Sequence, residues 1–121
     1  MPASADFIEF LREQLAPLGT ITSRRMFSGA SLYLDGTIFA YIFDDTLYFK
    51  VDAASRAMFE VEGSTPFTYD SKSGPRTING MWRAPDRLFD DPDAMQEFAR
   101  SALAASHRRA KKKLQKRKAK I

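Results

Sequence analysis

The chain has 121 residues, of which 44% are hydrophobic and 12% aromatic, enough for one domain with a buried core but too few for two. It has no cysteine, which excludes disulfides, thiolate metal sites and cysteine nucleophiles. Nine of its 19 basic side chains and none of its 15 acidic ones lie in residues 107–121. Residues 1–106 therefore carry a charge of about −5, ten basic against fifteen acidic side chains, and the basic character of the chain belongs to its C-terminal extension.

The amino-terminal residues resemble no targeting signal. The sequence MPASAD includes an acid and lacks the basic and apolar segments of a secretory signal peptide. No apolar run approaches the roughly 18 to 20 residues that a membrane-spanning helix requires. We therefore expect a soluble, cytoplasmic protein with no membrane partner.

A helical pattern comes first along the chain. Ser4 is a candidate N-cap, and apolar residues then recur at i+3 and i+4 spacings from Phe7 to Leu18. Pro17 and Gly19 are stop signals. The sequence predicts a helix that begins after Ser4 and ends near Pro17.

The apolar period then changes to two, between Arg25 and Val51. Asp35-Gly36 is a strong hairpin-turn signal, and Asp44-Asp45 is a weaker one. These turns divide the segment into three antiparallel strands, and we expect a short strand around Met26 and Phe27 before them.

A second helix and a second hairpin follow. Asp52 is a candidate cap for a helix of about nine residues that ends at Gly63. Strands are predicted at 67–69 and 77–81, on either side of the polar loop 71–75, and residues 82–85 are expected to leave the sheet.

Asp91-Pro92-Asp93 is the start signal of the last predicted helix, with Pro92 at or near the first helical position, and the helix carries an apolar stripe as far as Leu103. Beyond Leu103 the stripe thins, so this helix either continues into solvent as a basic rod or frays. We divide the chain into an α+β domain, residues 1–106, and a basic extension, residues 107–121.

The order of the elements, α-β(3)-α-β(2)-α, predicts an α+β fold with two layers: a single antiparallel sheet with helices packed mainly on one face. A two-residue turn at Asp44-Asp45 places Tyr41 opposite Tyr48, and pairing across both turns assigns one apolar set to each face of the sheet. One set contains Leu32, Leu34, Phe39, Tyr41, Phe43 and Tyr48, with Lys50; the other contains Tyr33, Ile38, Ala40, Ile42, Leu47 and Phe49.

Because both faces are apolar, both are expected to be covered. We predict Phe39, Tyr41, Phe43 and Tyr48 as interface residues, in a face that is either core beneath helices or a contact between two copies of the chain. The alternative is a stacking platform for single-stranded nucleic acid, with Lys50 contacting phosphate.

Catalytic and metal-binding patterns are absent from the sequence. The single histidine, His107, has no neighbouring carboxylate, and there is no nucleophile elbow and no glycine-rich phosphate loop. Asp44, Asp45 and Asp52 occupy turn and cap positions, where local hydrogen bonds account for them. We expect a protein that is not an enzyme and that uses neither metal nor cofactor.

The C-terminal extension is the candidate nucleic-acid contact, since a dense cationic segment binds polyanions by counterion release, with little dependence on sequence. Two bulky apolar residues, Leu114 and Ile121, are too few for a membrane-binding face. The alternative is a solvated extension that binds nothing. The predicted phosphate-contacting residues are Arg108, Arg109, Lys111, Lys112, Lys113, Lys116, Arg117, Lys118 and Lys120.

Several separate segments resemble one known family in order and spacing. They are RRMFSGA at 24–30, LYLDG at 32–36, Phe39-Ala40, DTLYFKVD at 45–52, PFTY at 66–69 and WRAP at 82–85. Over residues 5–106 the chain resembles the N-terminal domain of the TfoX/Sxy family, without the second, helical domain of the full-length members.

The resemblance implies an α+β fold similar to secretion chaperones, often dimeric, and a non-enzymatic role. Better-known members are bacterial regulators of natural competence that act at promoters with a cyclic-AMP-dependent activator. We therefore expect a cytoplasmic regulatory or interaction protein, a homodimer, with a transcription-regulator partner and with DNA or RNA contacts through the extension. The alternative is a dimeric protein-binding adaptor of chaperone-like shape with no nucleic-acid role.

Overall fold

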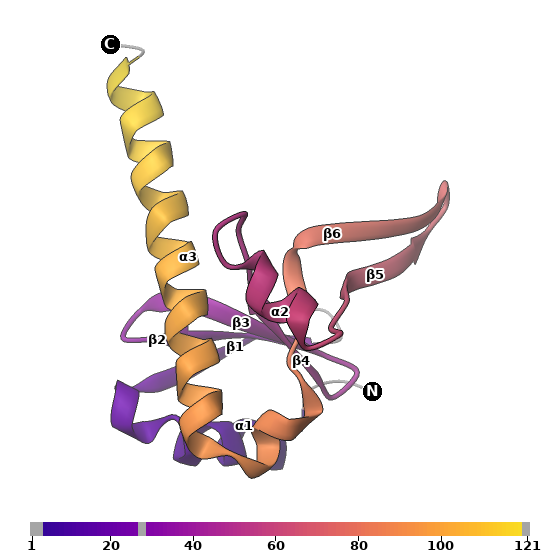
Figure 1. Ribbon diagram of the computed structural model, residues 1–121, viewed down its shortest axis with the longest axis vertical. Helices are drawn as coiled ribbons and strands as arrows, with labels where there is room; N and C mark the ends of the chain where they lie inside the picture. The colour runs from indigo at the N-terminus through magenta and orange to yellow at the C-terminus, as the bar shows by residue number, and fades with distance from the viewer. Residues whose placement is uncertain (1–3, 27–28, 120–121) are drawn as a thin grey trace.

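A computed structural model describes residues 4–26 and 29–119 (Figure 1). Its elements in chain order are α1 (Ala5–Gln14), a 3₁₀ turn η1 (Ala16–Leu18), β1 (Ile21–Met26), β2 (Gly29–Leu34), β3 (Thr37–Phe43), β4 (Thr46–Lys50), α2 (Arg56–Val61), β5 (Pro66–Ser71), β6 (Gly74–Arg83), a 3₁₀ segment η2 (Asp86–Asp90) and α3 (Pro92–Ala119).

The six strands form one antiparallel sheet in the order β1-β2-β3-β4-β6-β5. The buried residues of the helices belong to one continuous core with one face of this sheet, so the predicted α+β fold is confirmed. The strand expected before the three-strand segment is longer than predicted and begins at Ile21; Phe27 lies outside the described residues.

The first helix forms as its sequence signals predict. The Ser4 side chain accepts a hydrogen bond from the Phe7 backbone N–H at 3.1 Å, which satisfies one of the unpaired donors of the first turn. Ile8 and Leu11 are buried in the core, and η1 follows with Pro17 near its start. The helix therefore begins at the predicted signal, and it ends at Gln14, just before the 3₁₀ turn that contains Pro17.

The second helix is shorter than predicted, with six residues. The Asp52 carboxylate accepts a hydrogen bond from the Ser55 backbone N–H, which stabilises the turn before α2. Ser55, and not Asp52, holds the N-cap position. The loss of three residues follows from this additional turn.

The second hairpin is also longer than predicted. β5 and β6 run up to a tight turn at Lys72-Ser73, and β6 continues through Trp82 and Arg83. These two residues pair with Phe49 and Tyr48 of β4, so the prediction that they leave the sheet is wrong. They stay in the sheet because β6 pairs with β5 on one side and β4 on the other.

Aromatic rings fill the core between the sheet and the helices. Phe49 is fully buried, and its ring centroid lies 6.4 Å from that of Phe39, 6.2 Å from that of Phe59 and 6.5 Å from that of Phe98. Phe59 and Phe98 meet edge to face at 5.2 Å. One cluster therefore joins β3, β4, α2 and α3.

The pairing of β3 with β4 has the predicted register, with Tyr41 opposite Tyr48 and Phe43 opposite Thr46. The pairing of β2 with β3 does not. Tyr33 pairs with Ile38 and Leu32 with Ala40, which leaves Phe39 as an extra, bulged residue.

The bulge rotates three predicted residues into the core. Phe39, Leu32 and Leu34 are all buried there, at 0%, 0% and 6% exposure. The prediction that they share a face with Tyr41, Phe43 and Tyr48 is therefore wrong, and Phe39 is a core residue. A period-two pattern could not locate the bulge because both faces of β3 are apolar.

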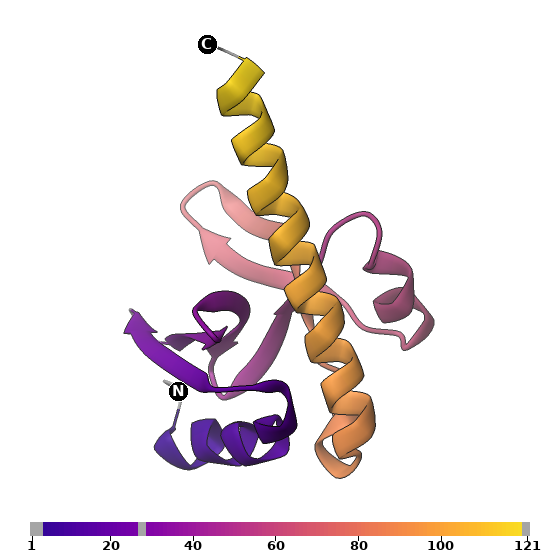
Figure 2. The same cartoon turned by 90° about the vertical axis from the view of Figure 1, so that its left-hand side faces the viewer.

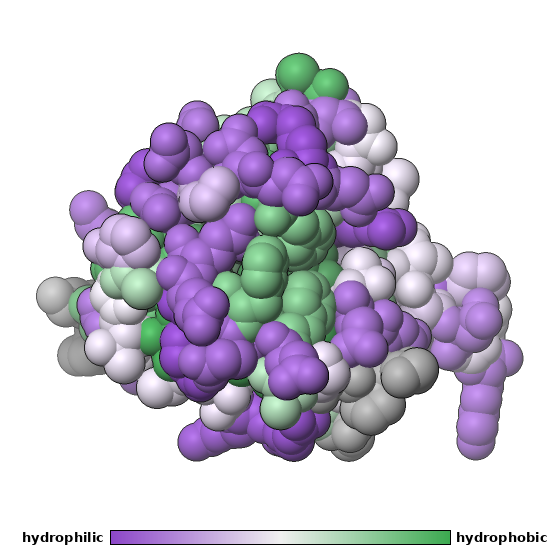
Figure 3. All heavy atoms as spheres, turned by 90° about the horizontal axis from the view of Figure 1, so that it is seen from below, coloured by the Kyte–Doolittle hydropathy of each residue, from purple (hydrophilic) through white to green (hydrophobic). Residues whose placement is uncertain are grey.

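Two apolar areas remain on the surface. On the sheet face away from the helices, neighbouring rings contact one another along Tyr41, Phe43, Tyr48, Phe67 and Tyr69. A second area, framed by hydrophilic side chains, lies at the end of the molecule formed by α1 and η2 (Figure 3), where Phe10 is 41% exposed and its ring lies 6.3 Å from that of Phe89. In the described ranges, no helix has both the length and the apolar character to cross a membrane.

Candidate nucleic-acid interface

The helix α3 is continuous for 28 residues and has two different parts. Its proximal part, residues 92–106, packs on the sheet, with Met95, Phe98 and Ala102 at 3% exposure or less. Its distal part, residues 107–119, projects beyond the sheet (Figures 1 and 2). Of the two predicted outcomes for this segment, the structure shows the basic rod.

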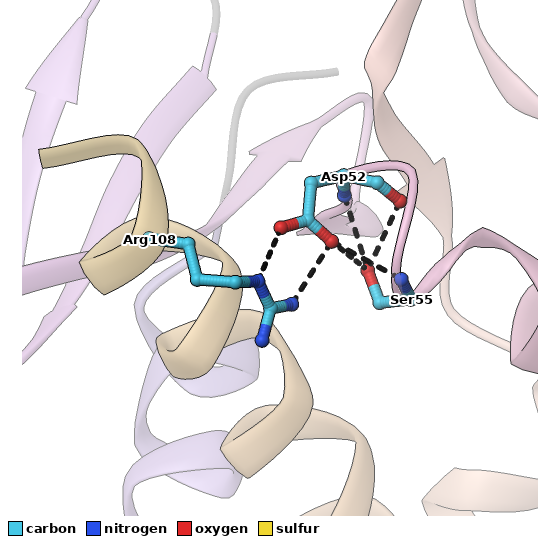
Figure 4. Close-up of polar contacts among 3 residues, drawn as sticks. All are labelled: Asp52, Ser55 and Arg108. Atoms are coloured by element: carbon cyan, nitrogen blue, oxygen red, sulfur yellow. Dashed lines mark hydrogen bonds and ion pairs between the residues drawn. The ribbon is translucent and has the colours of Figure 1, made fainter. Parts of the chain in front are cut away.

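Three contacts attach α3 to the body where it leaves the sheet. The Ser106 hydroxyl donates a hydrogen bond to the Ile38 carbonyl, and His107 Nε2 lies 3.4 Å from the hydroxyl of Thr37. The strongest contact is bidentate: Arg108 Nε and Nη2 donate to the two Asp52 carboxylate oxygens at 2.6 and 2.9 Å (Figure 4).

Asp52 is the residue whose role the sequence analysis missed. Hydrogen bonds from the Arg108 side chain first, and then from Ser55, lower the pKa of its carboxyl from 3.8 to about 2 despite partial burial. Asp52 is therefore ionised at neutral pH and fixes the start of the distal part. The turn signal at Asp52 was visible in the sequence, but its partner lies 56 residues away.

The predicted phosphate-contacting residues lie along the distal part. At about 100° per residue, six of those in the described helix fall within an arc of roughly 180°, whereas Lys111 and Lys118 fall outside it. The described cations of this arc are exposed: Arg108, Arg109, Lys112, Lys113, Lys116 and Arg117. Of Lys118 only the helical backbone is described, and Lys120 lies outside the described residues.

Like charges repeat along this arc at i,i+4 spacing, in the pairs 108/112, 109/113, 112/116 and 113/117. Each such pair destabilises a helix by about 0.2 to 0.5 kcal/mol at low salt. The distal part thus consists of mutually repelling cations, and an anion that lies along the arc would relieve this repulsion.

A cleft of about 480 Å³ lies beside the distal part, between α3, the end of β4 and the middle of β6. Lys50 of β4 faces into it together with Arg109 and Lys113 of α3. Partial burial, and then the charges of Arg109 and Lys113, lower the pKa of Lys50. The sequence pattern indicated Lys50 as a possible phosphate contact, but it contains no signal that α3 would lie beside this residue.

Three of the four predicted interface residues are on the outer sheet face. Tyr41, Phe43 and Tyr48 are half-buried there, and burial raises the pKa of both tyrosines. Gly29 makes room for this face, since a Cβ at that position would lie 2.6 Å from the Phe43 ring. Tyr41 also lines the cleft, so the aromatic face and the cationic arc meet there.

His107 is exposed at the start of the distal part. Within the described residues, its one side-chain hydrogen-bonding neighbour is the hydroxyl of Thr37. No three described histidine, aspartate or glutamate side chains are arranged to share a metal ion. The chemistry that this arrangement offers is anion binding by side chains of fixed positive charge.

The fold and this surface define a one-sheet α+β domain with a cationic helical projection. Residues 13–106 match the family model of the TfoX N-terminal domain, and the chain therefore belongs to this family, as its motifs indicate. The match ends at Ser106, so the cationic arc lies outside it. No curated protein matches the sequence.

Proposed function

We propose that this protein is a non-enzymatic, cytoplasmic regulatory protein that contacts nucleic acid through the distal part of α3. The observation that carries the proposal is the arrangement of the cations: a continuous helix, anchored by Arg108 and Asp52, presents them on one side. The family to which residues 13–106 belong suggests a regulatory role.

The expected mode of binding follows from the kinds of side chain on the arc. Lysine and arginine contacts to phosphate release condensed counterions and carry no sequence information by themselves. Sequence selectivity would then come from a protein partner, such as a transcription regulator bound to the body of the domain.

The experiment is a titration of labelled duplex DNA and single-stranded RNA with the full chain at 50 and 200 mM salt. Because Arg108 is bound to Asp52, the arc offers about five phosphate contacts, and affinity is expected to fall roughly five-hundredfold between the two salt concentrations. A triple variant, Arg109→Gln, Lys113→Gln and Arg117→Gln, removes three charges of the arc. It should reduce the slope of log affinity against log salt by about 2.7, or 0.9 for each contact.

The matched control is Lys72→Gln, Arg76→Gln and Arg100→Gln, which removes the same charge from exposed positions of the body. Its salt slope should stay close to that of the unmodified chain. Equal effects of the two triple variants would show that binding follows net charge alone and would contradict a dedicated contact.

The outer aromatic face favours a second candidate function, a protein-binding adaptor that works as a dimer. The rings of Tyr41, Phe43, Tyr48 and Phe67 contact one another and remain only half-buried. Tyr48→Ser with Phe43→Ser should convert a dimer to a monomer in sedimentation measurements without changing the salt slope. A dimer unaffected by this pair of substitutions would exclude the face as the contact between copies.

A further inference from the structure

The cleft beside α3 combines a cationic wall with an apolar one. Its cationic side chains come from two elements: Lys50 from β4, and Arg108, Arg109, Lys112 and Lys113 from α3. The apolar side is formed by Tyr41, Ile78 and Met81. A volume of about 480 Å³ is within the range of small-molecule sites.

Among the described residues, four of the five cations that line the cleft have no counter-charge. Asp52 is the one acid among the lining residues, and both its oxygens are occupied by Arg108. Lys50, Arg109, Lys112 and Lys113 form no ion pair with any carboxylate that the structure describes.

Three arginines elsewhere in the body lie close to carboxylates. Arg12 pairs with Glu9 at 2.6 Å and Arg87 with Glu62 at 2.6 Å, while Arg83 lies 3.6 Å from Asp86. Residues 1–106 carry more acids than bases, so carboxylates are not scarce. The distinguishing feature of the cleft is that four unpaired cations line one cavity together with Tyr41, Ile78 and Met81.

Lys50 is the informative member because it belongs to the body and not to the basic extension. It follows Tyr48 and Phe49 in β4, and the strand directs it to the outer side while Phe49 enters the core. Its half-buried position beside Arg109 and Lys113 disfavours its charge, as the lowered pKa shows. An anion between these three side chains would reverse that cost.

The apolar wall limits the kind of anion. Inorganic phosphate alone would make no apolar contact with Tyr41, Ile78 and Met81. Of these, Ile78 is 39% exposed and so has apolar surface available to a ligand. A nucleoside phosphate matches both walls, because its base is planar and stacks on aromatic or aliphatic surfaces while its phosphate binds lysine and arginine.

We propose that the cleft is a binding site for a nucleoside phosphate, with the phosphate between Lys50, Arg109 and Lys113 and the base against Tyr41 and Ile78. The ligand is either a free nucleotide or the terminal nucleotide of a strand. The site shares Arg109 and Lys113 with the strand contact proposed above, but Lys50 belongs to the cleft alone, and a free nucleotide can bind here even if the arc binds no strand.

The test is a calorimetric titration of the full chain with AMP, with inorganic phosphate and with a 5′-phosphorylated dinucleotide. AMP is expected to bind at least tenfold more tightly than inorganic phosphate. Lys50→Met should weaken AMP binding about tenfold, the loss of one charge-assisted hydrogen bond. The matched control Lys72→Met, at the exposed β5–β6 turn, should change it less than twofold.

A second pair of variants guards against misfolding of Lys50→Met. Arg109→Met lies in the cleft and Lys111→Met on the other side of the same helix, so only the first should weaken AMP binding. Tighter binding of the dinucleotide than of AMP would assign the site to strand ends, and equal binding would assign it to free nucleotides.

The proposal is overturned if AMP binds no better than inorganic phosphate, or if Lys50→Met and Lys72→Met have equal effects. Duplex DNA titrated against the same variants keeps the two proposals apart. Loss of AMP binding in Lys50→Met with an unchanged DNA salt slope supports the cleft alone, whereas a DNA slope near zero with intact AMP binding contradicts only the strand contact.

Discussion

The proximal and distal parts of α3 belong to one helix but are stabilised in different ways. Residues 92–106 bury Met95, Phe98 and Ala102 against the sheet. Residues 107–119 leave that surface after one ion pair, Arg108 with Asp52, and then carry repelling cations. Hydrophobic burial fixes the first part, whereas the second depends on helix propensity, one anchor and any bound anion.

The comparison shows how a fold can present a charged helix that makes no contribution to the hydrophobic core. A short isolated helix is only marginally stable in water. When it continues a packed helix, its nucleation has already taken place, and each added residue needs only to propagate it. The body thus provides the distal part with both a start and a direction.

The largest expected effect comes from breaking the proximal part. Phe98→Ala removes a ring that is 3% exposed and that contacts Phe49 and Phe59, so it should lower the free energy of unfolding by about 3 to 5 kcal/mol. Urea denaturation followed by circular dichroism measures this loss. A loss below about 1 kcal/mol would show that α3 contributes little to the core.

The same substitution, alanine to glycine, is expected to have different effects on unfolding in the proximal and distal parts of α3. Ala102→Gly at a fully buried position should cost about 1.5 to 2 kcal/mol, from helix propensity and a lost buried methyl group. Ala110→Gly at an exposed position should leave the global unfolding free energy unchanged and speed hydrogen exchange only in residues 107–119. Equal global losses for the two variants would mean that α3 unfolds as one unit.

The anchor is expected to contribute about 1 kcal/mol or less, since both partners are partly exposed. Arg108→Met should therefore increase exchange of the distal amide protons by no more than about fivefold, with the proximal amides unaffected. Arg100→Met, an exposed arginine of the proximal part, is the matched control.

The smallest expected effect is a dependence on pH. Because the pKa of Asp52 is about 2 in the folded protein and 3.8 in its unperturbed state, the stabilisation from its charged form is complete above about pH 4 and is lost as the pH falls toward 2. Exchange of distal amides, corrected for intrinsic rates, should rise over that window in the unmodified chain. In the Asp52→Asn variant, the corrected exchange rates should not change between about pH 4 and pH 2. A rise in this variant like that in the unmodified chain would assign the effect to other carboxyl groups.

Much of the fold could be predicted because its signals are local. Ser4 caps α1, Asp35-Gly36 and Asp44-Asp45 form hairpin turns, and the register of β3 with β4 follows from the second turn. Both aspartates of that turn take positive φ angles, 51° and 53°, which aspartate tolerates better than most residues. Failures arose where an extra residue, Phe39, interrupts the alternation, and where β6 continues past Met81 to Arg83.

The site was predicted only in part, for a different reason. The cations of the distal part were visible as composition, and so was Lys50 as an outward residue of a strand. Their proximity depends on the direction in which α3 crosses the sheet, which is set by packing of Phe98 on Phe49 and Phe59. No local pattern near Lys50 or Asp52 encodes that crossing.

The central claim is that the distal part of α3 is a cationic helix that a bound polyanion stabilises. Hydrogen exchange along α3, measured at low salt with and without duplex DNA, tests it most directly. The account predicts that, without DNA, the distal amides exchange much faster than the proximal ones, and that DNA slows the distal amides selectively. Distal amides that are as protected as the proximal ones without DNA, or that DNA leaves unchanged, would contradict it.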